Sequence, residues 1–308
     1  MPELSLVVCI HRQRELLQRM LHHAEGCFDE LVVVHDGPDD SGVRSLVEDR
    51  YGGRFFERPR RFQQEPHWAF AWGQTRHDWI LRWDADEFPD PALREWLRAF
   101  RTQADPPEDV SGFTFIHPLW DGSRARTSRW PRRIALIDRR RVRHIGMADQ
   151  APIPDGRLVE LDLVLHHQPP NATYGVRYTI ANTKVRRWHE EIARSLLGKP
   201  TDLPCWRWDK PEWPDKWEQI RRRPLLTALA RLVLSPLWNA REMIAYREPL
   251  RPSCLTTFPL QHWMTCLAYM RMRRENKGAI AATAAAPAQP AAKPTEPIPH
   301  AAPARDSK

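Results

Sequence analysis

The stretch Trp79-Ile80-Leu81-Arg82-Trp83-Asp84-Ala85-Asp86-Glu87 joins an apolar run to three carboxylates within four residues. Its apolar part predicts a strand of a parallel sheet that is buried on both faces. Residues 4–10, 31–34 and 54–57 carry similar strand signals, and segments with apolar residues at helical spacing lie between them. This alternation predicts an α/β fold built from βαβ units.

Acidic residues follow two of these strands directly. Asp84-Ala85-Asp86-Glu87 ends the strand at 79–83, and His35-Asp36-Gly37-Pro38-Asp39-Asp40 ends the strand at 31–34. Open α/β sheets bind ligands beyond the carboxyl ends of their strands. Crowded carboxylates repel one another unless a cation lies among them, and hard oxygen ligands suit Mg²⁺ or Mn²⁺. An acidic turn that caps the helix predicted at 91–102 is the alternative interpretation.

The remainder of the chain divides into three parts. Residues 91–170 are irregular and tend to β-structure, and residues 171–278 return to helical patterns. The last part, 279–308, consists almost entirely of Ala, Pro and charged residues, so we expect it to be disordered. The predicted architecture is therefore a Rossmann-type sheet with a mixed second half, a C-terminal helical extension and a tail.

Charge and cysteine content restrict the function less than the acidic motifs do. The chain of 308 residues carries a net charge of +8, which suits phosphate-bearing substrates, anionic lipids and nucleic acid alike. Its five cysteines include no C-x-x-C pair, which argues against a zinc ribbon or a disulfide scaffold. No signal-peptide pattern is present. We expect a cytoplasmic protein, and peripheral attachment to the inner face of the cytoplasmic membrane stays open.

The strand at residues 6–10, the segment from Val32 to Gly42 and the segment from Trp79 to Glu87 resemble, in this order, the nucleotide-sugar half of family-two glycosyltransferases of the GT-A fold. The D-A-D-E form is similar to a branch that includes bacterial lipopolysaccharide-core sugar transferases. Segments at 131–137, 146–150 and 161–167 occupy the places of later elements of that branch. The resemblance therefore implies a glycosyltransferase domain at 1–170, with a nucleotide-sugar half at 1–90 and an acceptor half at 91–170.

The resemblance implies roles for the acidic residues. Asp36 would recognise the nucleotide base, with an Asx turn before Gly37 as the alternative. Asp84 would contact ribose or metal, Asp86 would be the main metal ligand, and Glu87 would orient the site or join the metal shell.

A late histidine sometimes completes the metal site of GT-A enzymes. His166 and His167 end a predicted strand, and we slightly prefer His166 as a metal ligand, with a structural role as the alternative.

An inverting transfer needs a base that takes the proton from the acceptor hydroxyl. The branch has a G-x-x-H-E element, and the sequence here reads Gly146-Met147-Ala148-Asp149-Gln150. Asp149, one position before the family's glutamate, is therefore the predicted base. A turn acid paired with Arg143 or Arg157 is the alternative interpretation, and Asp121 is a weaker candidate in a predicted hairpin turn.

Cations and aromatic rings complete the predicted substrate site. Arg133 and Lys184 are candidates for neutralising diphosphate charge, and either is equally a surface cation. Trp120 and Trp130 flank the predicted acceptor region, and aromatic faces stack on sugar rings.

Two C-terminal segments, 221–246 and 255–277, combine large apolar residues with arginines at their ends. Segments of this kind lie in the interface of anionic bilayers. Helices that close over the sheet are the alternative interpretation.

Together these features predict an inverting, metal-dependent glycosyltransferase. It would move a hexose from a nucleotide sugar, most simply a UDP-sugar, to a glycan or lipid-linked saccharide in cell-envelope polysaccharide or lipopolysaccharide biosynthesis, using Mn²⁺ or Mg²⁺. An anionic membrane surface is a candidate partner and nucleic acid is not. Two alternatives remain: a sugar nucleotidyltransferase, which lacks its usual glycine-rich phosphate loop here, and a non-catalytic module that binds membranes or nucleic acid through basic runs.

Overall fold

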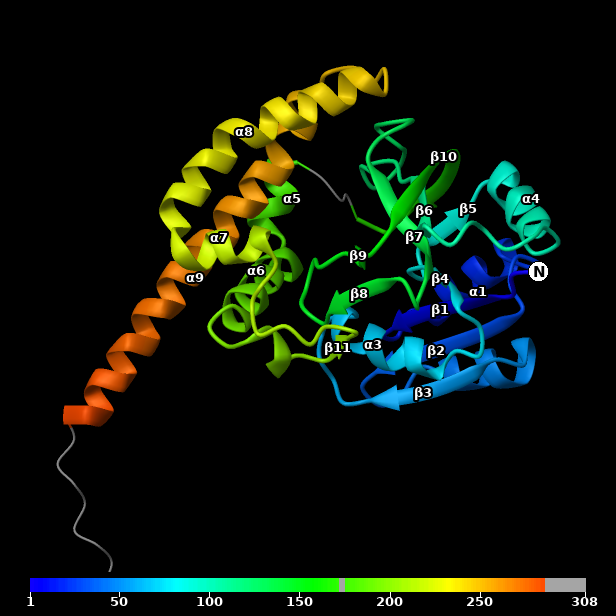
Figure 1. Ribbon diagram of the computed structural model, residues 1–308, viewed down its shortest axis with the longest axis horizontal. Helices are drawn as coiled ribbons and strands as arrows, with labels where there is room; N and C mark the ends of the chain where they lie inside the picture. The colour runs from blue at the N-terminus through cyan, green and yellow to red at the C-terminus, as the bar shows by residue number, and fades with distance from the viewer. Residues whose placement is uncertain (172–174, 286–308) are drawn as a thin grey trace, which may run out of the picture.

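The computed structural model describes residues 1–171 and 175–285, with side chains through Asn276. An α/β part with a large mixed sheet lies beside a helical part, and a small sheet lies between them (Figure 1). The predicted α/β class with a mixed second half and a helical extension is confirmed. The large sheet has eight strands in the order β3-β2-β1-β4-β7-β6-β10-β5.

The first half of this sheet is parallel. Its strands are β1 (Leu4–Ile10), β2 (Glu30–Asp36), β3 (Arg54–Arg58) and β4 (Trp79–Arg82). The continuous apolar runs of β1 and β2 are buried along their whole length, as expected of strands covered on both faces. The connecting helices are α1 (Arg14–His23), α2 (Val43–Ser45) continued by the π-helix η1 (Leu46–Arg50), and α3 (Glu65–Gln74).

The second half of the sheet is mixed. β7 (Arg132–Asp138) is antiparallel to both β4 and β6 (Val110–Ile116), and β10 (Arg157–His167) is parallel to β6. A short edge strand, β5 (Glu87–Pro89), begins inside the acidic stretch and pairs with β10, which sets His167 opposite Glu87. The helix α4 (Pro91–Phe100) follows, with Asp90 as its N-cap. β8 (Val142–Ile145), β9 (Ile153–Pro154) and β11 (Cys205–Trp206) form the small sheet.

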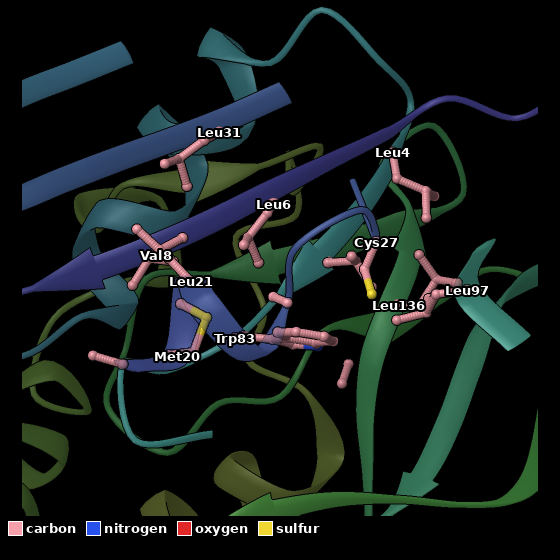
Figure 2. Packing of buried hydrophobic residues seen from close by; sticks show 14 of the residues in the cluster. Leu4, Leu6, Val8, Met20, Leu21, Cys27, Leu31, Trp83, Leu97 and Leu136 are labelled. Atoms are coloured by element: carbon pink, nitrogen blue, oxygen red, sulfur yellow. The ribbon is translucent and has the colours of Figure 1, made fainter. Parts of the chain in front are cut away.

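Apolar side chains cover both faces of the large sheet. On one face, residues of β1, α1, α4 and β7 form a cluster that includes Trp83 (Figure 2). On the other face, Trp68 and Trp72 of α3 pack against Val7, Val34 and Ile80. Burial on both sides fixes β1 and β4 rigidly and thus fixes where the acidic residues after β4 emerge.

The helical extension contains α5 (Val176–Ala181), α6 (Thr183–Ser195), the 3₁₀ turn η2 (Pro200–Asp202), α7 (Asp215–Arg222), α8 (Pro224–Ala245) and α9 (Pro252–Ala285). Within the helical stretch predicted at 171–278, Asn182 separates α5 from α6. Its side chain accepts hydrogen bonds from the backbone N–H groups of Lys184 and Val185. This N-cap begins a new helix and so ends the preceding one.

The end of α9 differs from the prediction. The tail was expected from Ala279, but α9 continues to Ala285 because this stretch is rich in alanine, the strongest helix former, and precedes Pro287. Residues 286–308 of the predicted tail lie outside the described residues. Over the part of the chain that the structure describes, no helix is long and apolar enough to cross a membrane.

The buried His144 of β8 makes the fold sensitive to acid. Its ring lies 5.3 Å from the ring of Trp72, and its Nε2 is 3.3 Å from the Glu65 carbonyl oxygen. Burial lowers the pKa of His144 to about 3. The folded chain thus holds a neutral imidazole at pH values where an unfolded chain, with a histidine pKa of about 6.5, binds a proton.

We therefore expect the free energy of unfolding to fall as the pH drops from 6.5 towards 3, and His144→Gln to weaken this dependence by up to about 1.4 kcal/mol per pH unit. Urea unfolding at a series of pH values measures the slope. His22→Gln, at an exposed position, serves as the control and should leave the slope unchanged. Equal slopes for wild type and His144→Gln would contradict the assignment.

Candidate active site

Arg133 of β7 holds the acidic cluster together. Its Nη1 lies 3.0 Å from Asp84 Oδ2 and 2.6 Å from Glu87 Oε1. Because β7 is the antiparallel neighbour of β4, the register places this guanidinium beside the carboxylates that follow β4. Arg133, one of the two cations considered for a diphosphate, therefore lies beside the carboxylates and partly neutralises them.

Glu87 is fully buried and both of its carboxylate oxygens have partners. Oε1 faces Arg133 and His117 Nε2, the latter at 2.7 Å, and Oε2 accepts a hydrogen bond from the backbone N–H of Asp84. Its position therefore suits organising the turn that carries Asp84 and Asp86. Of the two roles that the sequence suggests for Glu87, orienting the site or joining a metal shell, this geometry fits the first.

The electrostatics of the cluster follow from burial and Arg133. Burial would raise the pKa of Asp84, but the guanidinium groups of Arg133 and Arg82 hold it well below its usual range. For Glu87, burial outweighs the effect of Arg133 and raises the pKa. The pKa values of these two neighbouring carboxyl groups are thus shifted in opposite directions.

His167 is the histidine that reaches the acidic turn. Its Nε2 lies 3.5 Å from Asp86 Oδ2, and its ring stacks on that of His117 with centroids 4.8 Å apart. Burial would lower the pKa of His167, but the carboxylates of Asp86, Glu87 and Asp84 raise it.

His166, the slightly preferred candidate, is paired with Phe88 across the ladder between β10 and β5. Successive strand residues point to opposite faces, so His166 lies on the other side of the sheet from His167. The structure brings His167, and not His166, to the carboxylates.

Three buried polar atoms of this cluster have no hydrogen-bond partner within the described residues: Asp84 Oδ1, Arg133 Nε and Arg133 Nη2. Buried polar groups in folded proteins are nearly always paired, because an unpaired one costs about 1–3 kcal/mol. One acceptor and two donors left over at a strand end are what a ligand with hydroxyl and phosphate groups would satisfy.

A divalent cation fits this site only if substrate phosphates or water complete its coordination shell. Among the described residues, no group of three or more His, Cys, Asp or Glu side chains is arranged to hold a metal ion. Asp86, His167 and the free oxygen of Asp84 offer a partial shell. Mg²⁺ commonly binds through one or two carboxylates and completes its shell with substrate phosphates and water.

Asp36 lies at the end of β2, separated from β4 by β1. Its Oδ1 accepts hydrogen bonds from the backbone N–H of Arg61 and from His67 Nε2, at 2.9 Å, while Oδ2 faces Arg60 Nε at 3.4 Å. Burial would raise the pKa of Asp36, but His67 and Arg61 lower it. Both oxygens of Asp36 thus have partners: two hydrogen-bond donors at Oδ1 and the Arg60 guanidinium at Oδ2.

Asp149 is exposed and has a left-handed backbone, with φ at 58°. Its backbone N–H donates a hydrogen bond to Oε1 of Glu65, a half-buried residue at the start of α3. Desolvation of the Glu65 carboxylate raises its pKa. Gln150, at the family's glutamate position, accepts a hydrogen bond from Trp217 Nε1 of α7. The element thus joins the α/β part to the helical extension and leaves the carboxylate of Asp149 towards solvent.

Tyr178 of α5 was not predicted as a site residue. Burial, followed by the carboxylates of Asp86 and Asp149, raises the pKa of Tyr178 to about 12. The Tyr178 phenol thus lies within electrostatic reach of both Asp86 and Asp149. His117 and Glu65 were missed as well, since a lone histidine or glutamate carries no signal in a sequence.

The remaining candidates lie in other surroundings. Trp120 forms a β-bridge with Ala125 in the loop between β6 and β7. Asp121 accepts hydrogen bonds from Ser123 and from the backbone N–H of Arg124, as a hairpin-turn residue does. Lys184 is exposed on α6, with its Nζ over the ring of Trp188. Neither Asp121 nor Lys184 is drawn into the cluster around Arg133.

The large sheet has a parallel half and a mixed half, and a carboxylate cluster follows one of its parallel strands. This arrangement is consistent with a GT-A-like fold. Residues 5–164, just over half of the chain, match the family model described as Glycosyl transferase family 2. The chain belongs to this family, and the resemblance seen in its sequence is confirmed.

Comparison with other proteins adds little beyond the family. No curated protein matches the chain. Among solved structures, it is similar to CMP:2-keto-3-deoxy-manno-octonic acid synthetase complexed with CTP, with 14% identity and a TM-score of 0.28 over 38% of this chain. The match covers 54% of that protein, about half its length.

Replacement of Arg133 tests its role in the cluster. Arg133→Met would deprive the buried Glu87 and the half-buried Asp84 of this counterion, so we expect a loss of about 3–5 kcal/mol in the free energy of unfolding. Denaturant titration measures it. The control Arg124→Met, at a side chain that is 71% exposed, should stay within about 0.5 kcal/mol of wild type. Equal stability of the two variants would refute the role.

Proposed function

We propose that the protein is an inverting hexosyltransferase that takes its sugar from a nucleotide sugar, with UDP as the simplest nucleotide. The acceptor is a glycan or lipid-linked saccharide, and the D-A-D-E motif favours the branch of the family that works in lipopolysaccharide or other cell-envelope polysaccharide synthesis. The proposed location is the cytoplasmic side of the membrane.

One observation carries this proposal. Asp84 Oδ1, Arg133 Nε and Arg133 Nη2 are buried and unpaired at the carboxyl end of β4, with Asp36 at the end of the next but one strand. The oxygen suits a ribose hydroxyl or a cation, and the two nitrogens suit a diphosphate oxygen. Family membership supplies the expectation of a nucleotide-sugar donor.

The chain's own residues have distinct tasks in the proposed reaction. Asp36 binds the base and Asp84 the ribose or cation, while Arg133 orients the carboxylates and the diphosphate. Glu87 and His117 hold the turn in place. Mg²⁺ or Mn²⁺, when bound, would supply positive charge for the departing nucleoside diphosphate, and Asp86 with His167 would hold it. This role falls to His167 and not to His166, because the Nε2 of His167 lies 3.5 Å from Asp86 Oδ2.

Asp149 remains the proposed general base. Inversion requires the acceptor hydroxyl to attack the anomeric carbon from the side opposite the leaving diphosphate, while a carboxylate removes the hydroxyl proton. The backbone hydrogen bond from Asp149 to Glu65 fixes the residue in its left-handed conformation, a strained state often found at functional sites.

The alternatives explain less. A non-catalytic basic module would account for the net charge but not for unpaired buried groups beside clustered carboxylates. A sugar nucleotidyltransferase would also bind a nucleotide beyond a parallel sheet, but the turn after β1, His11-Arg12-Gln13, offers no glycine-rich phosphate loop.

Nucleotide binding tests the donor site. Titration calorimetry with UDP, GDP and their sugar conjugates, with and without Mn²⁺, should show metal-dependent binding of one nucleotide. Asp86→Ala should weaken it at least about tenfold and abolish turnover, because the cation loses its main ligand. The matched control Asp105→Ala, in an exposed loop, should bind as wild type does. Binding that survives Asp86→Ala would sink the metal assignment.

The general base is tested separately. Asn tolerates the left-handed region, so Asp149→Asn keeps the backbone and removes only the base. We expect kcat for sugar transfer to fall by about 10²–10⁴ while the Kd for the donor nucleotide stays unchanged. Asp209→Asn, at an exposed loop position, is the control. A rate near wild type for Asp149→Asn would assign the base to another residue.

A further inference from the structure

The helix α8 has its polarity reversed. Its buried residues are mostly small or polar: Thr227, Ala228, Ser235, Asn239 and Met243. Its outward face carries large apolar side chains, of which Val233, Leu237 and Ile244 are 63–64% exposed. A surface helix of a globular protein normally does the opposite.

The exposed side chains form a continuous stripe. Leu226, Leu229, Val233, Leu237 and Ile244 recur at helical spacing, so they lie above one another along about five turns. The stripe is flanked by further exposed apolar residues: Leu225, Leu232, Leu234 and Trp238. We call these nine residues the α8 stripe. An apolar face of this extent marks an interaction surface.

The packing of α8 leaves the stripe open. The main neighbours of the helix are α9 and α7, and Figure 1 shows α8 running along α9 far from the parallel strands. α9 itself turns Cys266 and Tyr269 into the core of the helical extension. Of the two segments considered for membrane contact, α9 therefore packs within the protein, and α8 presents its apolar face outwards.

Arginines bracket the stripe. Arg223 lies before the first turn, Arg241 near the end of the helix and Arg247 just after it, and all three are exposed. Within the described part of the chain, none of them has an ion-pair partner. The single acid of α8, Glu242, accepts hydrogen bonds from the indoles of Trp130 and Trp238.

We propose that the α8 stripe docks on an anionic lipid bilayer, with the helix lying in the plane of the interface. Leucines, valine and isoleucine would enter the acyl boundary, and Trp238 and the arginines would lie at the headgroups. A second copy of the chain fits less well, because pairing two α8 stripes brings arginine against arginine with no acid on that face to offset them.

Docking would also bring the loop before β7 close to the bilayer. Glu242 and Glu248, at the end of α8, bind Trp130 and the backbone of Ser128 and Arg129, so the loop before β7 is anchored to the docking helix. A bilayer under α8 would therefore lie next to this loop, where a lipid-linked acceptor is presented. This last step rests on the proposed function, whereas docking itself does not.

Vesicle sedimentation with the full chain tests docking. We expect binding to phosphatidylcholine vesicles that contain about 30% phosphatidylglycerol, weaker binding to phosphatidylcholine alone, and a decrease with salt. Val233→Glu combined with Leu237→Glu should reduce binding at least about tenfold. The control Ile180→Glu, at an apolar residue of α5 that is 53% exposed, should bind as wild type does.

A second variant tests the charges. Arg223→Gln combined with Arg241→Gln should lose the preference for the anionic vesicles and keep the folded circular-dichroism spectrum. The proposal would be overturned if wild-type protein bound neither kind of vesicle, or if the Val233→Glu, Leu237→Glu variant bound as tightly as wild type. A dimer in sedimentation velocity that the glutamates dissociate would also overturn it, since a second copy would then cover the stripe. Donor-nucleotide Kd, measured on the same variants, reports separately on the proposed transferase site.

Discussion

One guanidinium, that of Arg133, makes the acidic end of β4 possible. Three carboxylates in four residues, one of them fully buried, would drive the turn open without a nearby positive charge. The antiparallel pairing of β7 with β4 delivers that charge from the second half of the sheet. The mixed half of the sheet is therefore part of the electrostatics of the acidic cluster.

His35, the penultimate residue of β2, connects two neighbouring turns at the edge of the sheet. The turn after β1 contains Arg12 in a left-handed conformation. The His35 ring accepts a hydrogen bond from the backbone N–H of Arg12 through Nε2, and its Nδ1 lies 2.7 Å from the carbonyl oxygen of Gly37. One imidazole thus ties the turn after β1 to the turn after β2.

The sequence predicted the strands better than the details of the site. Continuous apolar runs identified β1, β2 and β4, and the adjacency of acids to strand ends located the carboxylate cluster. Which of His166 and His167 reaches the carboxylates depends on the face of β10 that each occupies. The pairing of β10 with β5 sets this, and the sequence gives no sign of a three-residue strand within the acidic stretch. The hydrogen bonds of Glu65 and His117 join distant segments of the chain, and no local sequence pattern records them.

The shared core around Gln150 changes how the helical extension should be regarded. Ile145, Met147 and Ala148 pack with Ile192, Leu196 and Trp217 in one cluster, and Gln150 is hydrogen-bonded to the same Trp217. The loop that carries Asp149 therefore packs against α6 and α7 of the helical extension. The extension is therefore not an independent module. A chimera that takes the α/β part into another protein would have to include these helices as well.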